Sequence, residues 1–285
     1  MNQLSKEKIL ELKKRANFIR QQIVKILGEA GGGHYGGSLS VVEILVALYF
    51  HILKVDPQNP LWPDRDRLIL SKGHACVALC PILAERGFFP RKLLSTFNKL
   101  DSPFGMHPDM HKIPGCDMST GSLGHGLPVG VGMALAGKMD EKSYRVFVIL
   151  GDGENDEGSV WEAAMSAAHY KLDNLIAIVD RNRVSLDGPT REIMPLEPLD
   201  EKWEKFGWHV QNVDGHKIKE IVASVESHQK GKPNVILAHT VKGKGVSFME
   251  GRFTWHSRVA TPEEETQALK ELESHRIDYE REKNG

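Results

Sequence analysis

GDGENDEGSVWEAAMSAAHYKLDNLIAIVDRN, residues 151–182, predicts the architecture of this 285-residue chain more directly than any other segment. The runs Arg145–Leu150 (RVFVIL) and Leu175–Val179 (LIAIV) are apolar and β-branched, as in strands that are buried on both faces. Between them, apolar residues recur at helical spacing, and Ser159 with Glu162 forms a predicted capping box. Because a βαβ crossover makes its two strands parallel, we expect an α/β fold, with a parallel sheet covered by helices on both faces.

Strands and helices alternate through the rest of the chain. A first helix is predicted from Ile9 to Leu27 and ends at the glycines 31–33, and a capping box at Ser40 and Glu43 precedes a mostly apolar helix. The remaining predicted elements are strands at Trp208–Val213 and Asn234–Thr240, a helix at Lys217–Gln229, and a peripheral helix in the charged tail from Thr261. No repeat or linker divides the chain, so we expect one domain over residues 1–285.

Composition excludes several classes of protein. The chain is 40% hydrophobic and 26% charged, its formal net charge is −1, and it has no basic block for nucleic acid. No apolar stretch is long enough to span a bilayer and the charged start is unlike a signal peptide, so a cytoplasmic protein is expected. Cys76, Cys80 and Cys116 lack the paired spacing of a zinc site, and we expect buried thiols rather than disulfides.

Polar residues follow both strands of the βαβ unit. Asp152 comes directly after the first strand and Asn182 after the second, and the carboxyl ends of parallel strands meet at one edge of the sheet. Carboxylate and amide oxygens suit Mg²⁺, while Gly151 and Gly153 let the backbone approach a phosphate closely. The spacing therefore predicts a metal-diphosphate site. The alternative is that Asp152 and Asn182 only shape the turns after two strands.

Histidines form the second pattern, because several of the 13 lie in loops rich in glycine or proline. These are His34, His74, His107, His125 and His256. Imidazole accepts or donates a proton near physiological pH, which suits proton transfer on sugar hydroxyls and carbonyls. The spacing of His107 and His111 does not predict a metal pair, because Pro108 and Pro114 disfavour the helix that would align them.

GDG at 151–153 followed by Asn182 resembles the signature of thiamine-diphosphate enzymes. From about Lys13 to Arg258, the chain resembles the amino-terminal half of transketolase, a diphosphate-binding domain. The resemblance implies that the Asp152 carboxylate, the Asn182 side chain and the Val184 backbone carbonyl hold Mg²⁺. It also implies that the Gly153 amide binds the diphosphate of thiamine diphosphate.

Further site residues follow from the same resemblance. His34, His107 and His256 correspond to histidines that contact the substrate, orient its hydroxyls and transfer protons. The implied cofactor contacts are His74 and His256 at the diphosphate, and Gly121, Ser122 and Leu123 in the loop STGSLG. Lys244 in KGKG is a further candidate for the diphosphate, and the alternative is a solvated loop residue.

The sequence departs from the family pattern near the site. Tyr35 replaces the proline that usually follows the substrate-facing histidine, and His125 stands where glutamine is common. Asn155 and Asp156 precede Glu157, which the resemblance places at a subunit contact and which also suits a helix amino terminus. The cofactor ligands are retained, and the departures concern the surroundings that determine specificity.

Thiamine chemistry also needs a carboxylate on the aminopyrimidine ring, which the family carries in a following pyrimidine-binding domain. The chain ends before such a domain, so we expect the amino-terminal subunit of a split transketolase, with two copies of each chain. It would transfer a two-carbon ketol unit between sugar phosphates. The glycine-rich helix after Gly121, with Gly126, Gly130 and Gly137, is either a contact surface for the partner or a tightly packed intrachain helix. The alternative functions are the α subunit of a thiamine-dependent 2-oxo acid dehydrogenase and a noncatalytic regulatory subunit.

Overall fold

A computed structural model describes residues 4–284 and is built around one parallel sheet. Its five strands have the order β1-β2-β3-β5-β4. They are β1 (Arg67–Leu70), β2 (Val146–Gly151), β3 (Leu175–Arg181), β4 (His209–Asp214) and β5 (Asn234–His239). All neighbouring strands are parallel, which confirms the predicted α/β class and the four predicted strands. The sequence analysis missed β1, which has only four residues and follows a charged segment.

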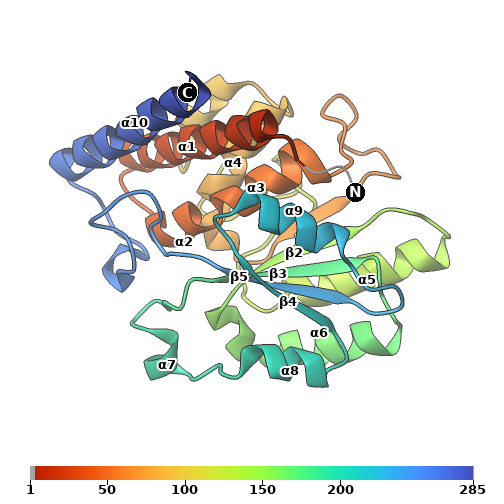
Figure 1. Ribbon diagram of the computed structural model, residues 1–285. Helices are drawn as coiled ribbons and strands as arrows, with labels where there is room; N and C mark the ends of the chain where they lie inside the picture. The colour runs from red at the N-terminus through yellow and green to blue at the C-terminus, as the bar shows by residue number, and fades with distance from the viewer. Residues whose placement is uncertain (1–3, 285) are drawn as a thin grey trace.

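Helices cover both faces of the sheet (Figure 1). On one face lie α1 (Lys6–Glu29), α3 (Val42–Ala47), α4 (Cys76–Arg86) and α9 (Ile218–Glu226). On the other lie α5 (Gly126–Met139), α6 (Gly158–His169) and α8 (Leu199–Lys205). Alternate residues of β2 enter opposite cores, Phe147 and Ile149 one of them and Val146 and Val148 the other. This alternation is the two-residue period of a strand that is buried on both sides.

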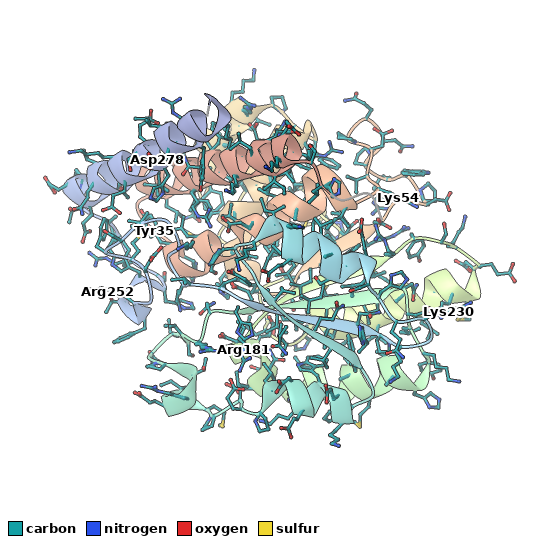
Figure 2. The ribbon with its side chains drawn as sticks, viewed as in Figure 1. Tyr35, Lys54, Arg181, Lys230, Arg252 and Asp278 are labelled. Carbon is teal, nitrogen blue, oxygen red and sulfur yellow. The ribbon has the colours of Figure 1, made fainter. Side chains whose placement is uncertain are left out.

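Shorter elements connect these layers, and a long helix closes the chain. The short elements are α2 (Tyr35–Ser40), α7 (Thr190–Ile193), the π-helical turn η1 (Leu48–Ile52) and the 3₁₀ turns η2 (Gly73–Ala75), η3 (Arg91–Thr96), η4 (Gly153–Asp156) and η5 (Phe253–Trp255). The last helix, α10 (Pro262–Asn284), runs alongside α1, and Asp278 on it lies at the edge of the molecule (Figures 1 and 2). Leu272 is fully buried there, and its carbonyl accepts a hydrogen bond from Asn17 at 2.8 Å. The predicted peripheral helix is therefore confirmed.

Three of the four glycines of α5 face the interior of the chain. A Cβ on Gly130 would lie 2.5 Å from the Val148 side chain, and one on Gly137 would lie 2.7 Å from the Tyr144 ring. Gly126 would meet Ser71 in the same way. These glycines therefore allow close packing within the chain, which was the second of the two interpretations of this helix.

Both predicted capping boxes are wrong. Ser40 is the last residue of α2, and its hydroxyl donates to Asp180 at 2.6 Å. Ser159 lies inside α6, and its hydroxyl donates to the Gly124 carbonyl at 3.0 Å. In each case, a partner distant in sequence takes the hydroxyl that a capping box would have used.

Two further observations concern the expected class of protein. Within residues 4–284, no helix combines the length and the apolar character needed to cross a membrane. All three cysteines are free thiols, with Cys76 and Cys80 buried and Cys116 half-buried. The expectation of buried thiols is thus confirmed at the first two positions.

Candidate functional site

The site lies at the carboxyl ends of β2 and β3, where the βαβ argument placed it. Asp152 follows β2, and Asn182 follows β3. Both line a pocket of about 190 Å³, together with Gly153 and Val184. Parallel pairing, with Gly151 opposite Asp180, is what brings the two strand ends together.

Asp152 is a buried carboxylate with several donors. Asp152 is only 3% exposed. Its carboxylate accepts hydrogen bonds from the Gly153 amide at 2.8 Å and from the Arg183 amide. Burial and the nearby charge of Asp180 raise the pKa of Asp152 to about 6. A cation at this position would favour the ionised carboxylate that burial disfavours.

Two further residues bring oxygen atoms that could coordinate a metal to the same pocket. Arg183 has a left-handed backbone conformation, with φ of 63°, and the turn around it directs both Asn182 and Val184 toward the pocket. The Asn182 side-chain oxygen accepts from the Val184 amide at 3.1 Å. Carboxylate, amide and carbonyl oxygens are ligands that suit Mg²⁺. Since the described part of the chain has no cluster of three or more His, Cys, Asp or Glu suited to a metal, a cation here would depend on these mixed donors.

Lys242, which was not predicted from the sequence, is one of two lysines that line this pocket. It is 2% exposed, and its ammonium donates to the carbonyls of Val184 at 2.9 Å and Ser185 at 2.8 Å. Its nitrogen also lies 2.8 Å from Nδ1 of His256. Burial and the charge of Lys72 lower the pKa of Lys242 to about 8.

Lys244, which the sequence analysis did select, lies elsewhere. Its ammonium pairs with Glu250 at 3.1 Å, and it is not among the residues that line the pocket. The structure therefore places the other lysine of KGKG at the site. The two lysines are two positions apart and each is followed by a glycine, so local sequence offers little signal that separates them.

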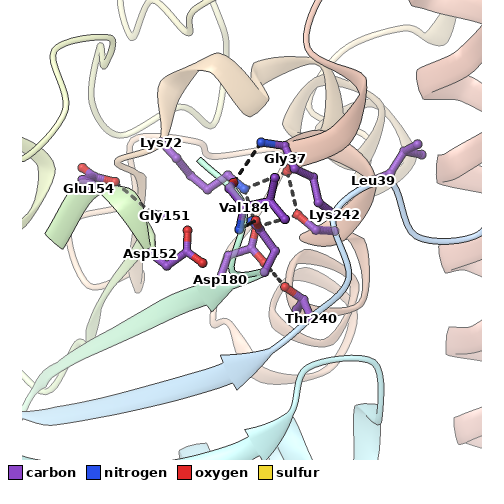
Figure 3. Close-up of polar contacts among 12 residues, drawn as sticks. Gly37, Leu39, Lys72, Gly151, Asp152, Glu154, Asp180, Val184, Thr240 and Lys242 are labelled. Carbon is purple, nitrogen blue, oxygen red and sulfur yellow. Dashed lines mark hydrogen bonds and ion pairs between the residues drawn. The ribbon is translucent and has the colours of Figure 1, made fainter. Parts of the chain in front are cut away.

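A second buried lysine, Lys72, also lines the pocket. Lys72 is 1% exposed, forms an ion pair with the fully buried Asp180, and donates to the Gly37 carbonyl at 2.7 Å. Ser40 and Thr240 also donate to Asp180 (Figure 3). Burial alone would raise the pKa of Asp180, but the Lys72 charge and these hydrogen bonds lower it. Lys72 lies in the SKGH motif, which had been interpreted only for its histidine.

Four of the five loop histidines form one cluster, and two of them, His74 and His256, line the pocket. The ring centre of His34 lies 5.3 Å from that of His74, 5.5 Å from that of His256 and 6.3 Å from that of His107. His125 does not join them, because it is exposed at the start of α5 and its ring contacts the Leu123 carbonyl at 3.1 Å.

Burial favours the neutral form of His34, His74 and His256. Desolvation lowers the pKa of His34 and His74, and it lowers the pKa of His256 to about 3. Positive charge on Lys242 acts in the same direction at all three rings. Neutral rings can accept a hydrogen bond or a proton from a substrate hydroxyl.

Tyr35 packs between two loops that carry these histidines. Its side chain is fully buried, and its ring meets that of Trp255 edge to face, with centres 5.6 Å apart. Tyr35 directly follows His34, and Trp255 directly precedes His256. Tyr35 is therefore part of the scaffold behind the histidines.

Glu154 joins three loops of the site and was also missed. It is 2% exposed, and its carboxylate accepts from the Gly124 amide at 2.8 Å, the Gly151 amide at 3.0 Å and the Ser71 hydroxyl. This carboxylate thus connects the loop STGSLG to the end of β2 and to the SKGH segment. Within STGSLG, Leu123 lines the pocket, whereas Gly121 and Ser122 are exposed outside its lining.

Comparisons with known proteins agree with this geometry. A family model described as transketolase, thiamine diphosphate binding domain, matches residues 12–277. The 6-deoxy-6-sulfo-D-fructose transketolase subunit of Clostridium sp. (strain MSTE9) is 51% identical, over 94% of this chain and 98% of that protein. An apulose-4-phosphate transketolase subunit of Phocaeicola vulgatus is 44% identical, over 97% of this chain and 98% of that protein.

The fold is also similar to that of solved transketolases. The crystal structure of transketolase from Campylobacter jejuni matches with a TM-score of 0.86 at 30% identity. The match covers 94% of this chain but 45% of the other, so the chain spans about half the length of that solved transketolase.

Replacement of Glu154 tests its role in joining the loops. Glu154→Ala leaves the buried amides of Gly124 and Gly151 without an acceptor, and we expect it to lower the free energy of unfolding by about 2–5 kcal/mol. Glu154→Gln should cost less, because its remaining side-chain oxygen still accepts. Urea unfolding measures both, with the exposed Glu162→Ala as a control that should stay within about 0.5 kcal/mol. Equal losses in Glu154→Ala and the control would contradict the role.

Proposed function

The chain belongs to the transketolase family, and on that basis we propose that it is the amino-terminal subunit of a split transketolase. In this proposal, it transfers a two-carbon ketol unit from a ketose phosphate to an aldose phosphate, as part of cytoplasmic sugar phosphate metabolism. The observation that carries it is the convergence of Asp152, Asn182 and Val184 with Lys242, His74 and His256 in one pocket, beside which His34 and His107 lie. Relatives of nearly the same length that are named transketolase subunits support it further.

The proposed cofactors are thiamine diphosphate and Mg²⁺, held by one diphosphate-binding domain. Asp152, Asn182 and Val184 provide the metal ligands, and the oxygen donors present fit this ion. The proposed diphosphate contacts are Gly153, His74, His256 and Lys242, and the loop residues Gly121, Ser122 and Leu123 are proposed as further cofactor contacts. Lys242 takes the part first expected of Lys244. When bound, thiamine diphosphate supplies the nucleophilic carbon that carries the ketol unit.

The histidines act on the substrate in this proposal. His34, His107 and His256 orient the hydroxyls of the sugar, and the neutral rings of His34 and His256 accept hydrogen bonds from them. Lys242 assists, because its charge lowers the pKa of both rings and keeps them acceptors. The buried site also excludes water from the polar contacts, which strengthens them.

A partner subunit is part of the proposal. It carries the pyrimidine-binding domain and the carboxylate that thiamine chemistry requires, and two copies of each chain form the assembly. Support comes from the solved transketolase, whose chain is about twice as long as the matched region. Of the alternatives, the family match disfavours a 2-oxo acid dehydrogenase subunit. A noncatalytic subunit is distinguished by the activity experiment below.

Loss of the buried carboxylate should remove cofactor binding. In Asp152→Ala, thiamine diphosphate should bind more weakly by over 100-fold, beyond the range of about 10- to 100-fold for loss of an outer-shell partner. Calorimetry with and without Mg²⁺ on the full chain, alone and with its partner, measures this. Asp156→Ala changes an exposed carboxylate in the same loop and should bind normally. Metal-dependent affinity equal to wild type in Asp152→Ala would refute the assignment.

His256→Ala should reduce turnover far more than stability. The ring is half-buried in a polar loop, so we expect kcat to fall by about 100-fold while the melting temperature changes little. Steady-state kinetics and thermal unfolding on the assembled enzyme give both numbers, and the exposed His111→Ala serves as the control. Unchanged kcat in His256→Ala would eliminate its role.

The split-enzyme proposal is tested by reconstitution. The purified chain with Mg²⁺ and thiamine diphosphate should not transfer ketol units between sugar phosphates, because the carboxylate for the aminopyrimidine ring comes from the partner. Activity should rise as the partner is added and should level off at equal amounts of the two chains. Robust turnover by this chain alone would overturn the proposal. Partner binding without turnover on any of a panel of sugar phosphates would favour the noncatalytic alternative.

A further inference from the structure

Behind Lys242 lies a buried network of three charged or polar side chains from separate elements. Arg20 of α1 is 5% exposed. Its guanidinium donates one hydrogen bond to each carboxylate oxygen of Glu43 of α3, both at 2.6 Å. His216, in the turn between β4 and α9, contacts the same carboxylate through Nδ1 at 2.9 Å. A two-pronged guanidinium–carboxylate pair is strongly directional, so it fixes the relative positions of its elements.

The network holds the backbone on both sides of Lys242. The amide of Val241, the preceding residue, donates to Nε2 of His216 at 2.9 Å. Two residues after Lys242, the carbonyl of Lys244 accepts from Nε of Arg20 at 2.9 Å. Arg20 also donates to the carbonyl of Leu39 in α2 at 3.1 Å (Figure 3 shows Leu39 beside the site). Hydrogen bonds to the backbone on both sides of Lys242 thus hold the segment that carries this lysine.

The directions of these hydrogen bonds define the state of His216. Because the Val241 amide donates to Nε2, that nitrogen carries no hydrogen, so Nδ1 carries one and donates to Glu43. Burial would raise the pKa of Glu43, but the Arg20 charge and the hydrogen bonds from His216 and Arg20 lower it to about 2. Glu43 is therefore an ionised acceptor, and each member has a defined role as donor or acceptor.

None of the three side chains lines the cofactor pocket, so they act on it only through other residues. A buried ion pair adds little net stability compared with apolar packing, whereas its directional bonds specify geometry. Here those bonds end on the segment around Lys242 and on α2. We propose that Arg20, Glu43 and His216 are positioning residues that hold the segment around Lys242 so that its ammonium lies in the cofactor pocket. This inference rests on the proposed role of Lys242 in cofactor binding.

The first test uses the cofactor-free chain. His216→Phe keeps a ring of similar size but removes both hydrogen bonds, and it should speed hydrogen exchange at the Gly243 amide by about tenfold. Gly243 donates to the Gly36 carbonyl at 2.9 Å, a bond that the substitution does not touch. Exchange at Gly243 equal to wild type would overturn the proposal.

A matched control separates positioning from general stability. Asp117 is another buried carboxylate, paired with Arg65 at 2.5 Å and accepting from the Leu68 amide at 2.8 Å. It lies beside the start of β1, and the cofactor pocket lies beyond the other end of that strand. Asp117→Asn should lower the melting temperature and leave exchange at Gly243 unchanged. Faster exchange at Gly243 in both variants would show a merely structural role.

The second test is a double-mutant cycle on thiamine diphosphate affinity, measured by calorimetry with Mg²⁺ on the full chain assembled with its partner. His216→Phe should weaken binding by about tenfold, and Lys242→Met should weaken it at least as much. The double variant should bind no more weakly than Lys242→Met alone, because the network acts through that lysine. His216→Gln, which keeps a donor and an acceptor, should recover most of the affinity. Fully additive losses, or normal binding by His216→Phe, would refute the proposal.

The two tests also separate this inference from the proposed function. If the wild-type assembly failed to bind thiamine diphosphate, the proposed function would be wrong. The exchange rates at Gly243 would still decide whether the network positions the segment.

Discussion

The ion pair between Lys72 and Asp180 is the interaction on which the site depends. It connects the end of β1 to the end of β3, and the same carboxylate accepts from Ser40 in α2 and from Thr240 after β5. Removal of two charges from water is costly, and a buried pair is tolerated only when other hydrogen bonds satisfy its remaining atoms. Here those bonds come from α2 and from the residue after β5, so that the pair and its partners join four separate segments. The requirement to satisfy one buried carboxylate therefore determines how the loops above the sheet are arranged.

The other buried charged groups of the pocket also have polar partners. Asp152 and Glu154 are buried carboxylates, and backbone amides donate to both. Asp152 remains available to a cation, whereas Glu154 is used to join loops. Lys72 and Lys242 supply positive charge, and together with burial they lower the pKa of the His74 and His256 rings. The result is a pocket that combines hard oxygen donors, two ammonium groups and neutral imidazoles, a combination that suits a metal-bound diphosphate beside a polyhydroxylated substrate.

The position of Lys242 depends on residues that lie outside the pocket. The network of Arg20, Glu43 and His216 joins α1, α3 and the turn after β4 to the segment that carries this lysine. Packing of Tyr35 on Trp255 similarly joins the loops of His34 and His256. Flexible, glycine-rich loops gain defined geometry in this way, because their positions are set by buried side chains of the helical layer. Placement of site residues on loops that a rigid scaffold holds is a common solution in α/β proteins.

Local sequence was sufficient for the βαβ unit and for the convergence of Asp152 and Asn182, because strand periodicity and the handedness of the crossover are properties of contiguous residues. It was insufficient wherever the partner lies far along the chain. The hydroxyls of Ser40 and Ser159 bond to Asp180 and Gly124 instead of capping their own helices. Likewise, the choice between Lys242 and Lys244, the role of Glu154 and the inward face of the α5 glycines depend on which distant atoms approach them. Those approaches are settled by packing of the whole chain, since burial and hydrogen-bond satisfaction are properties of the folded molecule.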